Sequence, residues 1–197
     1  MSDSPGVNKT RRNLIVASAT AGGVAVVGTA VPFVASMLPS ERAKAMGAPV
    51  EADISALKPG EMQIFEWRGK PVWILRRTKE MVEGIKKNES ELTDPRSEVP
   101  QQPHYAKNEF RSIKPDIVVL EGVCTHLGCS PQLKGLEAKA EMGQDWRGGF
   151  FCPCHGSKFD FAGRVFRGAP APTNLTVPPH SFLSDSTLRI GDDKKGA

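Results

Sequence analysis

The sequence has no cluster of basic residues, no internal repeat and no low-complexity tract. Its 26 Lys and Arg residues are scattered along 197 residues, and the formal net charge is only +4. Proteins that bind nucleic acid concentrate their basic residues on one face or along one helix, so this function class has no support. The length leaves room for one ordinary domain and a smaller appendage.

Charged residues are missing altogether from residues 14–38. About 25 helical residues reach roughly 37 Å, which is enough to cross a hydrocarbon core of about 30 Å. We therefore predict a transmembrane helix over residues 13–38. No polar face breaks the run, which argues against a buried core helix. A cleaved signal peptide remains the alternative, with Ala43-Lys44-Ala45 as a small-residue cleavage site.

Basic residues precede this run, at Lys9, Arg11 and Arg12. The positive-inside rule places residues 1–12 in the cytoplasm and everything after residue 40 outside it. We expect a single-pass protein of the bacterial inner membrane with a periplasmic domain. Arg11-Arg12 also looks like a twin-arginine signal, a route that exports proteins already folded around a cofactor.

Residues 39–50 lose the hydrophobicity without gaining a strand pattern, and we expect a hinge or a plain tether there. The domain is predicted over residues 51–191, followed by a tail at 192–197. Short apolar runs separated by Gly and Pro turns indicate an antiparallel β-sandwich or small barrel. One helix is expected at Lys79–Lys87, with Thr78 as its N-cap. Residues 88–115 are polar and contain proline, which is typical of a surface excursion. The predicted strands are Met62–Trp67, Val72–Leu75, Ile117–Leu120, Leu175–Val177, Ser181–Leu183 and Leu188–Ile190.

All four cysteines lie in one 31-residue window, together with two of the four histidines. The two segments are Cys124-Thr125-His126-Leu127-Gly128-Cys129 and Cys152-Pro153-Cys154-His155-Gly156-Ser157. Cysteine and histidine mixed at such spacings indicate a metal site. A structural zinc site would use two of each, leaving two thiols that an oxidising compartment would join.

The pairing of CTHLGC with CPCHGS closely resembles the Rieske proteins. The resemblance implies a [2Fe–2S] cluster, with Cys124 and Cys152 on one iron and His126 and His155 on the other. It also implies a disulfide between Cys129 and Cys154. The fold that follows is mainly β: an N-terminal transmembrane helix and a Rieske-type antiparallel sandwich with an inserted cluster-binding subdomain at about residues 120–166.

The resemblance extends to Gly168-Ala169-Pro170-Ala171-Pro172, which matches the proline-rich loop that covers the cluster in quinol-oxidising members. By the same resemblance His155 faces the quinol, and Ser157 donates a hydrogen bond to a cluster sulfide. Leu127 shields the cluster from water, although core filler is the alternative. Many high-potential members carry a tyrosine where this chain has Phe159, so we expect a lower potential here.

Neutral imidazoles explain why such a cluster accepts an electron readily. Two ferric ions, two sulfides and two thiolates sum to zero charge, so reduction gives only −1. Four thiolates would start the cluster at −2. An imidazole on ferric iron also holds its remaining proton less tightly than one on reduced iron, which couples the electron to a proton.

The family resemblance is to the iron–sulfur subunit of ubiquinol–cytochrome c reductase, an oxidoreductase of the respiratory chain. It implies cytochrome b and a c-type cytochrome as partners in a dimeric complex, with one electron passing from ubiquinol to the c-type cytochrome and protons released into the periplasm. The alternative is the small Rieske subunit of a periplasmic molybdenum oxidase such as arsenite oxidase. A Rieske ferredoxin or oxygenase component fits less well, and a zinc-stabilised tethered domain is the non-redox alternative. His104 and His180 are taken as ordinary surface or turn residues, and the lone Tyr105 in the 88–115 segment gives no reason for a catalytic role.

Overall fold

The computed structural model describes residues 8–192, without the side chains of residues 42 and 46. Its contacts divide the chain into two compact units, with the boundary between Ala45 and Met46. That boundary falls inside the predicted hinge. Most of the predicted cytoplasmic segment, residues 1–7, and nearly all of the predicted tail, residues 193–197, lie outside the described residues.

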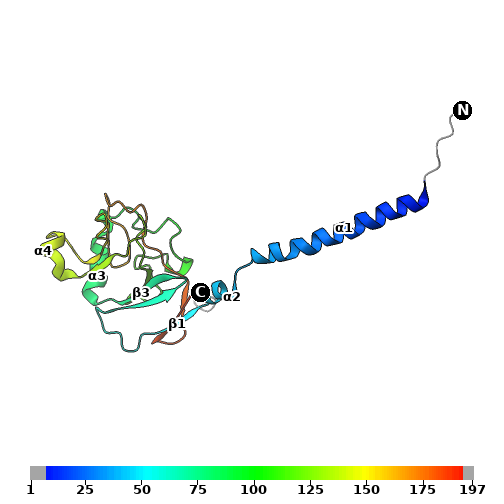
Figure 1. The fold of residues 1–197 in the computed structure, drawn as a ribbon. Coiled ribbons are helices and arrows are strands. Elements are labelled where there is room, and N and C mark those ends of the chain that lie inside the picture. The colour runs from blue at the N-terminus through cyan, green and yellow to red at the C-terminus, as the bar shows by residue number, and fades with distance from the viewer. Residues whose placement is uncertain (1–7, 193–197) are drawn as a thin grey trace. The chain divides into compact units, whose positions relative to one another are not determined.

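The first unit is dominated by helix α1, Lys9–Ser36, which has 28 residues and a mean hydropathy of 1.9 over its most apolar stretch (Figure 1). The helix begins and ends slightly earlier than residues 13–38, and at 1.5 Å per residue it spans about 42 Å. Its hydroxyl residues bond back to carbonyls one turn earlier, as Thr20 does to Val16 at 2.9 Å and Thr29 to Ala25 at 3.0 Å. These bonds satisfy polar groups that lipid could not.

The predicted hinge is not featureless. A short helix α2 occupies Glu41–Met46, with Glu41 at its start and an ion pair of 2.7 Å between Glu41 and Lys44. Strand β1 then begins at Val50, the last residue of the predicted hinge. The predicted hinge therefore contains a short helix and the first residue of a strand, with Gly47, Ala48 and Pro49 between them.

Within the described residues, the second unit is built from three antiparallel three-stranded sheets, which confirms the predicted mainly β class. The strand orders are β1-β9-β8, β2-β3-β4 and β5-β6-β7. The strands are β1 Val50–Asp53, β2 Met62–Trp67, β3 Lys70–Arg76, β4 Ile117–Glu121, β5 Gln132–Lys134, β6 Gly149–Phe151, β7 Lys158–Phe159, β8 His180–Phe182 and β9 Thr187–Ile190.

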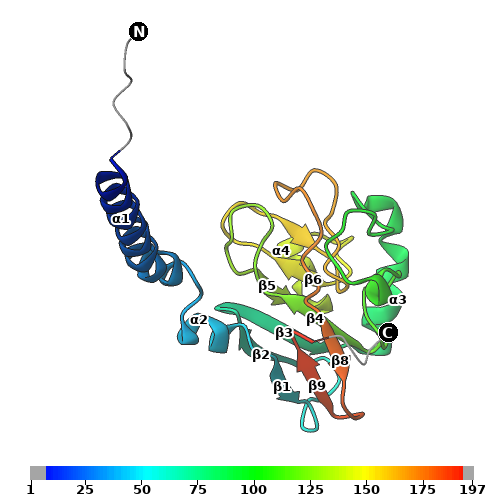
Figure 2. The same cartoon turned by 90° about the vertical axis from the view of Figure 1, so that its right-hand side faces the viewer.

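Strands β3 and β4 are buried on both faces, which explains their continuous hydrophobic runs. Val72 and Ile74 face a core shared with Leu188 and Ile190 of β9. The alternate residues Trp73 and Leu75 face a second core, which contains Cys124, Cys152 and the aromatic residues of β6 and β7. Figure 2 shows β1, β8 and β9 on one side of β3, with β5 and β6 on the other. The sheet of β3 and β4 thus separates the supporting half of the domain from the cysteine-bearing half.

Helix α3, Lys79–Lys87, forms as predicted, and the Thr78 hydroxyl accepts from the N–H of Met81. The remaining helical turns are α4, Lys139–Met142, and the 3-10 turns Glu89–Glu91, His104–Ala106 and Leu136–Ala138. The prediction of a surface excursion at residues 88–115 is wrong, because Leu92, Ser97 and Arg111 are completely buried. The segment contributes polar and apolar side chains to the interior and is part of the domain.

The predicted strand at Leu175–Val177 is also wrong. Its backbone bonds go to three different places, from Leu175 to Gly163, from Glu121 to Thr176 and from Val177 to Gln101, so no ladder with one neighbour develops. His180 was expected at the surface, but it begins β8 and is 1% exposed. Tyr105 donates to the His180 carbonyl at 2.8 Å and accepts from its N–H at 2.7 Å, which joins the 88–115 segment to β8.

Candidate functional site

The two cysteine-bearing segments have the same backbone geometry. In the first, the N–H of Cys124 donates to the carbonyl of Cys129 at 2.7 Å, and the N–H of Gly128 to that of Cys124 at 3.0 Å. In the second, Cys152 donates to Ser157 at 2.8 Å and Gly156 to Cys152 at 2.9 Å. Gly128 and Gly156 hold φ of 83° and 79° at equivalent positions, where a side chain would be strained. The chain thus presents two matching turns, each opened by a cysteine.

Strands position these turns. The first follows β4, whose five residues are all buried, and the second lies between β6 and β7. Trp73 stacks on Phe150 with ring centroids 5.0 Å apart, which packs β6 against the central sheet. Gly122 leaves room for this ring, since a Cβ there would lie 2.2 Å from the Trp73 side chain. The turns therefore rest on a rigid base, which is what a site that binds a cofactor needs.

The turns bring two thiols and two imidazoles together. Cys124 and Cys152 are free and buried, whereas His126 is half-buried and His155 is exposed. The two imidazole rings lie edge to face with centroids 4.7 Å apart. Two cysteines inside and two histidines toward solvent form a donor set that fits an iron–sulfur cluster with mixed ligands.

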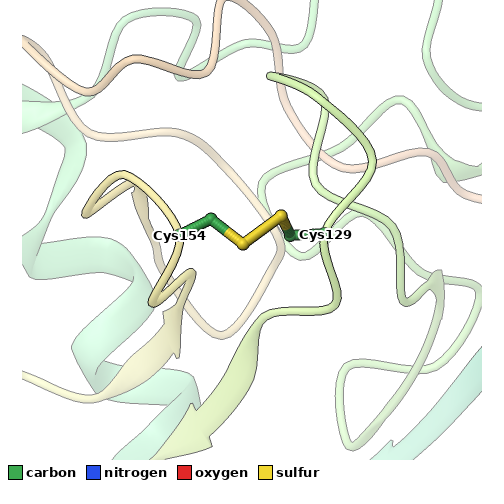
Figure 3. Close-up of a disulfide and its surroundings, with 2 residues drawn as sticks. All are labelled: Cys129 and Cys154. Carbon is green, nitrogen blue, oxygen red and sulfur yellow. A yellow bond between two sulfur atoms is a disulfide. The ribbon is translucent and has the colours of Figure 1, made fainter.

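The disulfide joins the two turns. Cys129 and Cys154 are bonded, as Figure 3 shows, which confirms the expected pairing. The sulfur of Cys152 lies within 4.8 Å of both disulfide sulfurs, so this bond borders the thiol pair. Because the disulfide uses both of its sulfur atoms, the thiolates left for a metal are those of Cys124 and Cys152.

Burial raises the pKa of the Cys124 thiol, and the neighbouring Cys152 thiol raises it further. The backbone N–H of His126 and the hydroxyl of Ser157 lower it, because both donate toward the sulfur. A metal ligand must be deprotonated, so iron binding has to displace the Cys124 proton. The two donors are already in place to stabilise negative charge on that sulfur once the proton has left.

Side-chain hydroxyls tie the two turns to the proline-rich segment 168–172 and to Thr173, the residue that follows it. The N–H of Ala171 donates to the Ser157 oxygen at 3.0 Å, and the Thr125 hydroxyl donates to the carbonyl of Thr173 at 2.7 Å. Ser157 was singled out from the sequence, but Thr125 was missed. The position of Thr125, next to a cysteine in the first turn, was the signal that could have found it.

Two further residues singled out from the sequence are placed clearly. The Leu127 side chain is 70% exposed, which excludes the core-filler alternative and leaves an apolar group on the outside of the first turn. Phe159 is completely buried in β7 and belongs to the same core as Cys124 and Cys152. A group added to its ring would therefore stay near the thiol pair rather than reach solvent.

A buried ion pair lies just after β7, the strand that follows the second turn. Arg164 is 2% exposed and Asp160 fully buried, and the guanidinium Nη2 lies 2.7 Å from Oδ2 of Asp160. Asp160 also accepts the backbone N–H groups of Ala162 and Arg164 at 2.9 and 2.8 Å. Sequence reasoning missed this pair, although opposite charges four residues apart beside apolar residues were a visible signal.

Comparison with known proteins agrees with this geometry. Residues 49–179 match the family described as "Rieske [2Fe-2S] domain". Residues 1–40 match "Ubiquitinol-cytochrome C reductase Fe-S subunit TAT signal", in agreement with the twin-arginine interpretation of Arg11-Arg12. The mainly β domain with two Cys–His turns is therefore of the Rieske class, which carries a [2Fe–2S] cluster.

Full-length relatives narrow the assignment. A protein of Allochromatium vinosum named "Ubiquinol-cytochrome c reductase iron-sulfur subunit" is 55% identical over 98% of this chain and 93% of its own length. A Blastochloris viridis protein of the same name is 40% identical over 97% and 98%. The solved structure "Hyperthermophilic respiratory Complex III" aligns with 29% identity, a TM-score of 0.46, and coverage of 88% and 97%. This chain belongs to the family of ubiquinol–cytochrome c reductase iron–sulfur subunits.

Proposed function

We propose that this chain is the electron-transfer subunit that oxidises ubiquinol and delivers one electron to a c-type cytochrome on the periplasmic side of the inner membrane. The observation that carries the proposal is the pair of matching turns, with buried thiols, outward imidazoles and a disulfide between them. The near full-length similarity to proteins named as this subunit supports the same conclusion.

In this proposal Cys124 and Cys152 hold one iron, and His126 and His155 hold the other. The bound [2Fe–2S] cluster supplies a one-electron acceptor whose histidine ligation gives a comparatively high potential. The four ligand residues come from two turns that the disulfide and the proline-rich segment hold together.

His155 is the residue that contacts the quinol. Its ring is exposed, so an imidazole nitrogen can accept a hydrogen bond from a quinol hydroxyl and then its proton. The proton leaves to the periplasm when the ring returns to its starting state. Leu127, exposed on the other turn, offers an apolar surface that limits the entry of water to the cluster.

Cytochrome b supplies the rest of the quinol pocket, and the c-type cytochrome accepts the electron. α1 anchors the chain with residues 1–12 in the cytoplasm, and residues 39–50 act as the hinge between anchor and domain. The domain spans residues 51–191, with the cluster-binding subdomain at about 120–166. We expect the chain to work within a dimeric complex rather than alone.

Low-temperature EPR on native membranes, reduced with ascorbate, tests the proposal. We expect a Rieske-type signal that changes shape when a quinol-site inhibitor is added. A Rieske signal whose shape does not change when the inhibitor is added would favour the molybdenum-oxidase alternative. Stoichiometric zinc without any such signal would overturn the redox function.

The ligand assignment has its own test. Pulsed EPR on protein labelled with ¹⁵N-histidine should show two coupled imidazole nitrogens. His155→Asn should abolish the two-nitrogen pattern, whereas His104→Asn, at an exposed histidine in the same domain, should leave it unchanged. An unchanged pattern in His155→Asn would contradict the assignment.

A further inference from the structure

Two arginine side chains are buried in the domain with only neutral partners. Arg77 is 3% exposed and donates to the carbonyls of Phe110 at 2.9 Å and Phe161 at 3.3 Å, and to the Ser112 hydroxyl at 2.7 Å. Among the residues that the structure describes, no carboxylate forms an ion pair with it. Its positive charge is therefore not hydrated, and Asp160 and Asp116 attract it without forming an ion pair with it.

Arg111 is completely buried and is bonded in the same way. Its Nη1 donates to the carbonyls of Ala162 and Gly163 at 3.1 and 3.3 Å. Its Nη2 donates to the carbonyl of Leu175 at 2.7 Å and to the amide oxygen of Gln102 at 3.0 Å. Within the described part of the chain these acceptors are all uncharged.

The third buried arginine does not change this balance. Arg164 is paired with Asp160, whose carboxylate also attracts Arg77 and Arg111, so one fully buried carboxylate faces three buried guanidinium groups and leaves an excess of positive charge. Burial lowers the pKa of both to about 10, so both guanidinium groups stay protonated near neutral pH. Burying a charge without a counter-ion is costly, and a neutral side chain could bond some of the same carbonyls. The retained charge therefore calls for a reason.

The backbone at Arg111 is held in an uncommon conformation to bring this side chain inward. Its φ is 49°, in the left-handed region that non-glycine residues seldom adopt. The turn is built by Asn108, whose side-chain oxygen accepts the N–H of Phe110 at 3.0 Å and whose amide donates to the carbonyl of Ser112 at 2.8 Å. Strain of this kind persists only where the surroundings demand it.

The acceptors connect both arginines to the site. Phe161, Ala162 and Leu175 belong to the same buried core as Cys124 and Cys152. Phe161 and Ala162 follow β7, the strand that leaves the second turn, and Leu175 follows the proline-rich segment. The two charges thus lie in the interior of the cysteine-bearing half of the domain, where water does not screen them.

We propose that the buried charges of Arg77 and Arg111 raise the reduction potential of the cluster. One-electron reduction takes a cluster with two thiolates and two neutral imidazoles from zero to −1, so a fixed positive charge in the same interior stabilises the reduced form. At an effective dielectric constant of about 20, a unit charge changes the reduction equilibrium roughly sixfold if it lies about 15 Å from the cluster. The inference rests on the proposed ligand set for this charge count.

The sharpest test neutralises a charge without removing the arginine. Gln102→Glu places a carboxylate on the existing 3.0 Å contact with Arg111 at nearly the same side-chain volume, and it gives up the bonds that the Gln102 amide donates to the carbonyls of Ser97 and Val99 at 2.9 and 3.2 Å. Redox titration followed by EPR should show reduction about sixfold less favourable, which is about 46 mV lower for one electron. Gln144→Glu makes the same change of net charge at an exposed position and should leave the potential unchanged.

Substitution of the arginines separates charge from position. Arg77→Gln and Arg111→Gln should each lower the potential, whereas Arg77→Lys and Arg111→Lys should hold it near the wild-type value. Cluster content and the EPR line shape show first that the cluster and its ligands are present. An unchanged potential in Gln102→Glu, or equal falls in the Lys and Gln variants, would overturn the proposal without touching the proposed function.

Discussion

The backbone N–H of Ala171 donates a 3.0 Å hydrogen bond to the hydroxyl oxygen of Ser157. This contact joins the proline-rich segment to the last residue of the second turn. Because the oxygen accepts from Ala171, the hydroxyl proton remains free to be donated, and the Ser157 hydroxyl lowers the pKa of the Cys124 thiol. One buried hydroxyl therefore both holds the covering segment and stabilises negative charge on a proposed iron ligand.

Ser157→Ala should lower the reduction potential of the cluster. The lost donor favours the more negative, reduced form, and one hydrogen bond of about 1 kcal/mol corresponds to about 43 mV for one electron. Redox titration by EPR measures the shift. Ser157→Thr keeps the hydroxyl and should stay close to the wild-type value, and an equal fall in both variants would contradict the hydrogen-bond explanation.

Thr125→Val should loosen the other contact of the covering segment. The hydroxyl of Thr125 is the donor to the Thr173 carbonyl at 2.7 Å, so valine leaves that carbonyl without this partner at nearly constant volume. We expect a loss of about 1 kcal/mol in stability and faster bleaching of the cluster on warming. Thr125→Ser is the matched control, and a bleaching rate equal to the wild type in Thr125→Val would argue against the role of this bond.

Removal of the disulfide should weaken the site more than either hydroxyl variant. The bond joins residues 25 apart in sequence, and closing such a loop is worth roughly 3 to 4 kcal/mol in the chain-entropy model. Cys129→Ala combined with Cys154→Ala avoids a stray thiol. Iron content and thermal unfolding of the double variant should both fall, and a fully loaded cluster of unchanged thermal stability would show that the turns hold their positions without the bond.

The sequence predicted the metal-binding residues of the site better than the buried contacts that hold them in place. Cys124 and Cys152 stand in local motifs, so their spacing alone indicated a metal site, and the family resemblance identified the disulfide. Strands β3 and β4 were visible because burial on both faces gives unbroken hydrophobic runs. These features depend on residues that are close together in the chain.

What could not be predicted depends on contacts between distant segments. Arg111 looks like a loop residue beside Asn108, and its burial arises only because carbonyls 51 to 64 residues away accept its donors. Leu175–Val177 has the composition of a strand, but its backbone partners lie on three separate segments. Local propensity carries no information about such partners, so tertiary packing overrides it.

Phe159→Tyr should raise the reduction potential. The ring is completely buried in the core that contains Cys124 and Cys152, and we expect the new hydroxyl to donate to a cysteine sulfur there. One added hydrogen bond of about 1 kcal/mol corresponds to about 43 mV for one electron. The same redox titration measures it. Phe159→Leu, which adds no donor, is the control, and no rise in Phe159→Tyr would show that the hydroxyl bonds elsewhere.

Asp160→Asn should destabilise the domain strongly. The carboxylate is fully buried and neutralises Arg164, whose Nε and Nη2 lie 2.8 and 2.7 Å from Oδ2. An asparagine would still accept backbone N–H groups, but it would leave a third buried arginine without a counter-ion, at a cost of about 3–5 kcal/mol. Chemical denaturation measures the change.

The exposed ion pair between Glu91 and Arg147, at 2.7 Å, provides the comparison for Asp160→Asn. Both of its side chains contact solvent, so Glu91→Gln should cost less than about 1 kcal/mol. The contrast between the two variants separates the effect of burial from that of ion pairing as such. Similar losses of stability in both variants would mean that Arg164 does not depend on Asp160. The support for the second turn would then come from the carbonyls of Ile85 and Pro95, which accept from Arg164 at 2.6 and 3.2 Å.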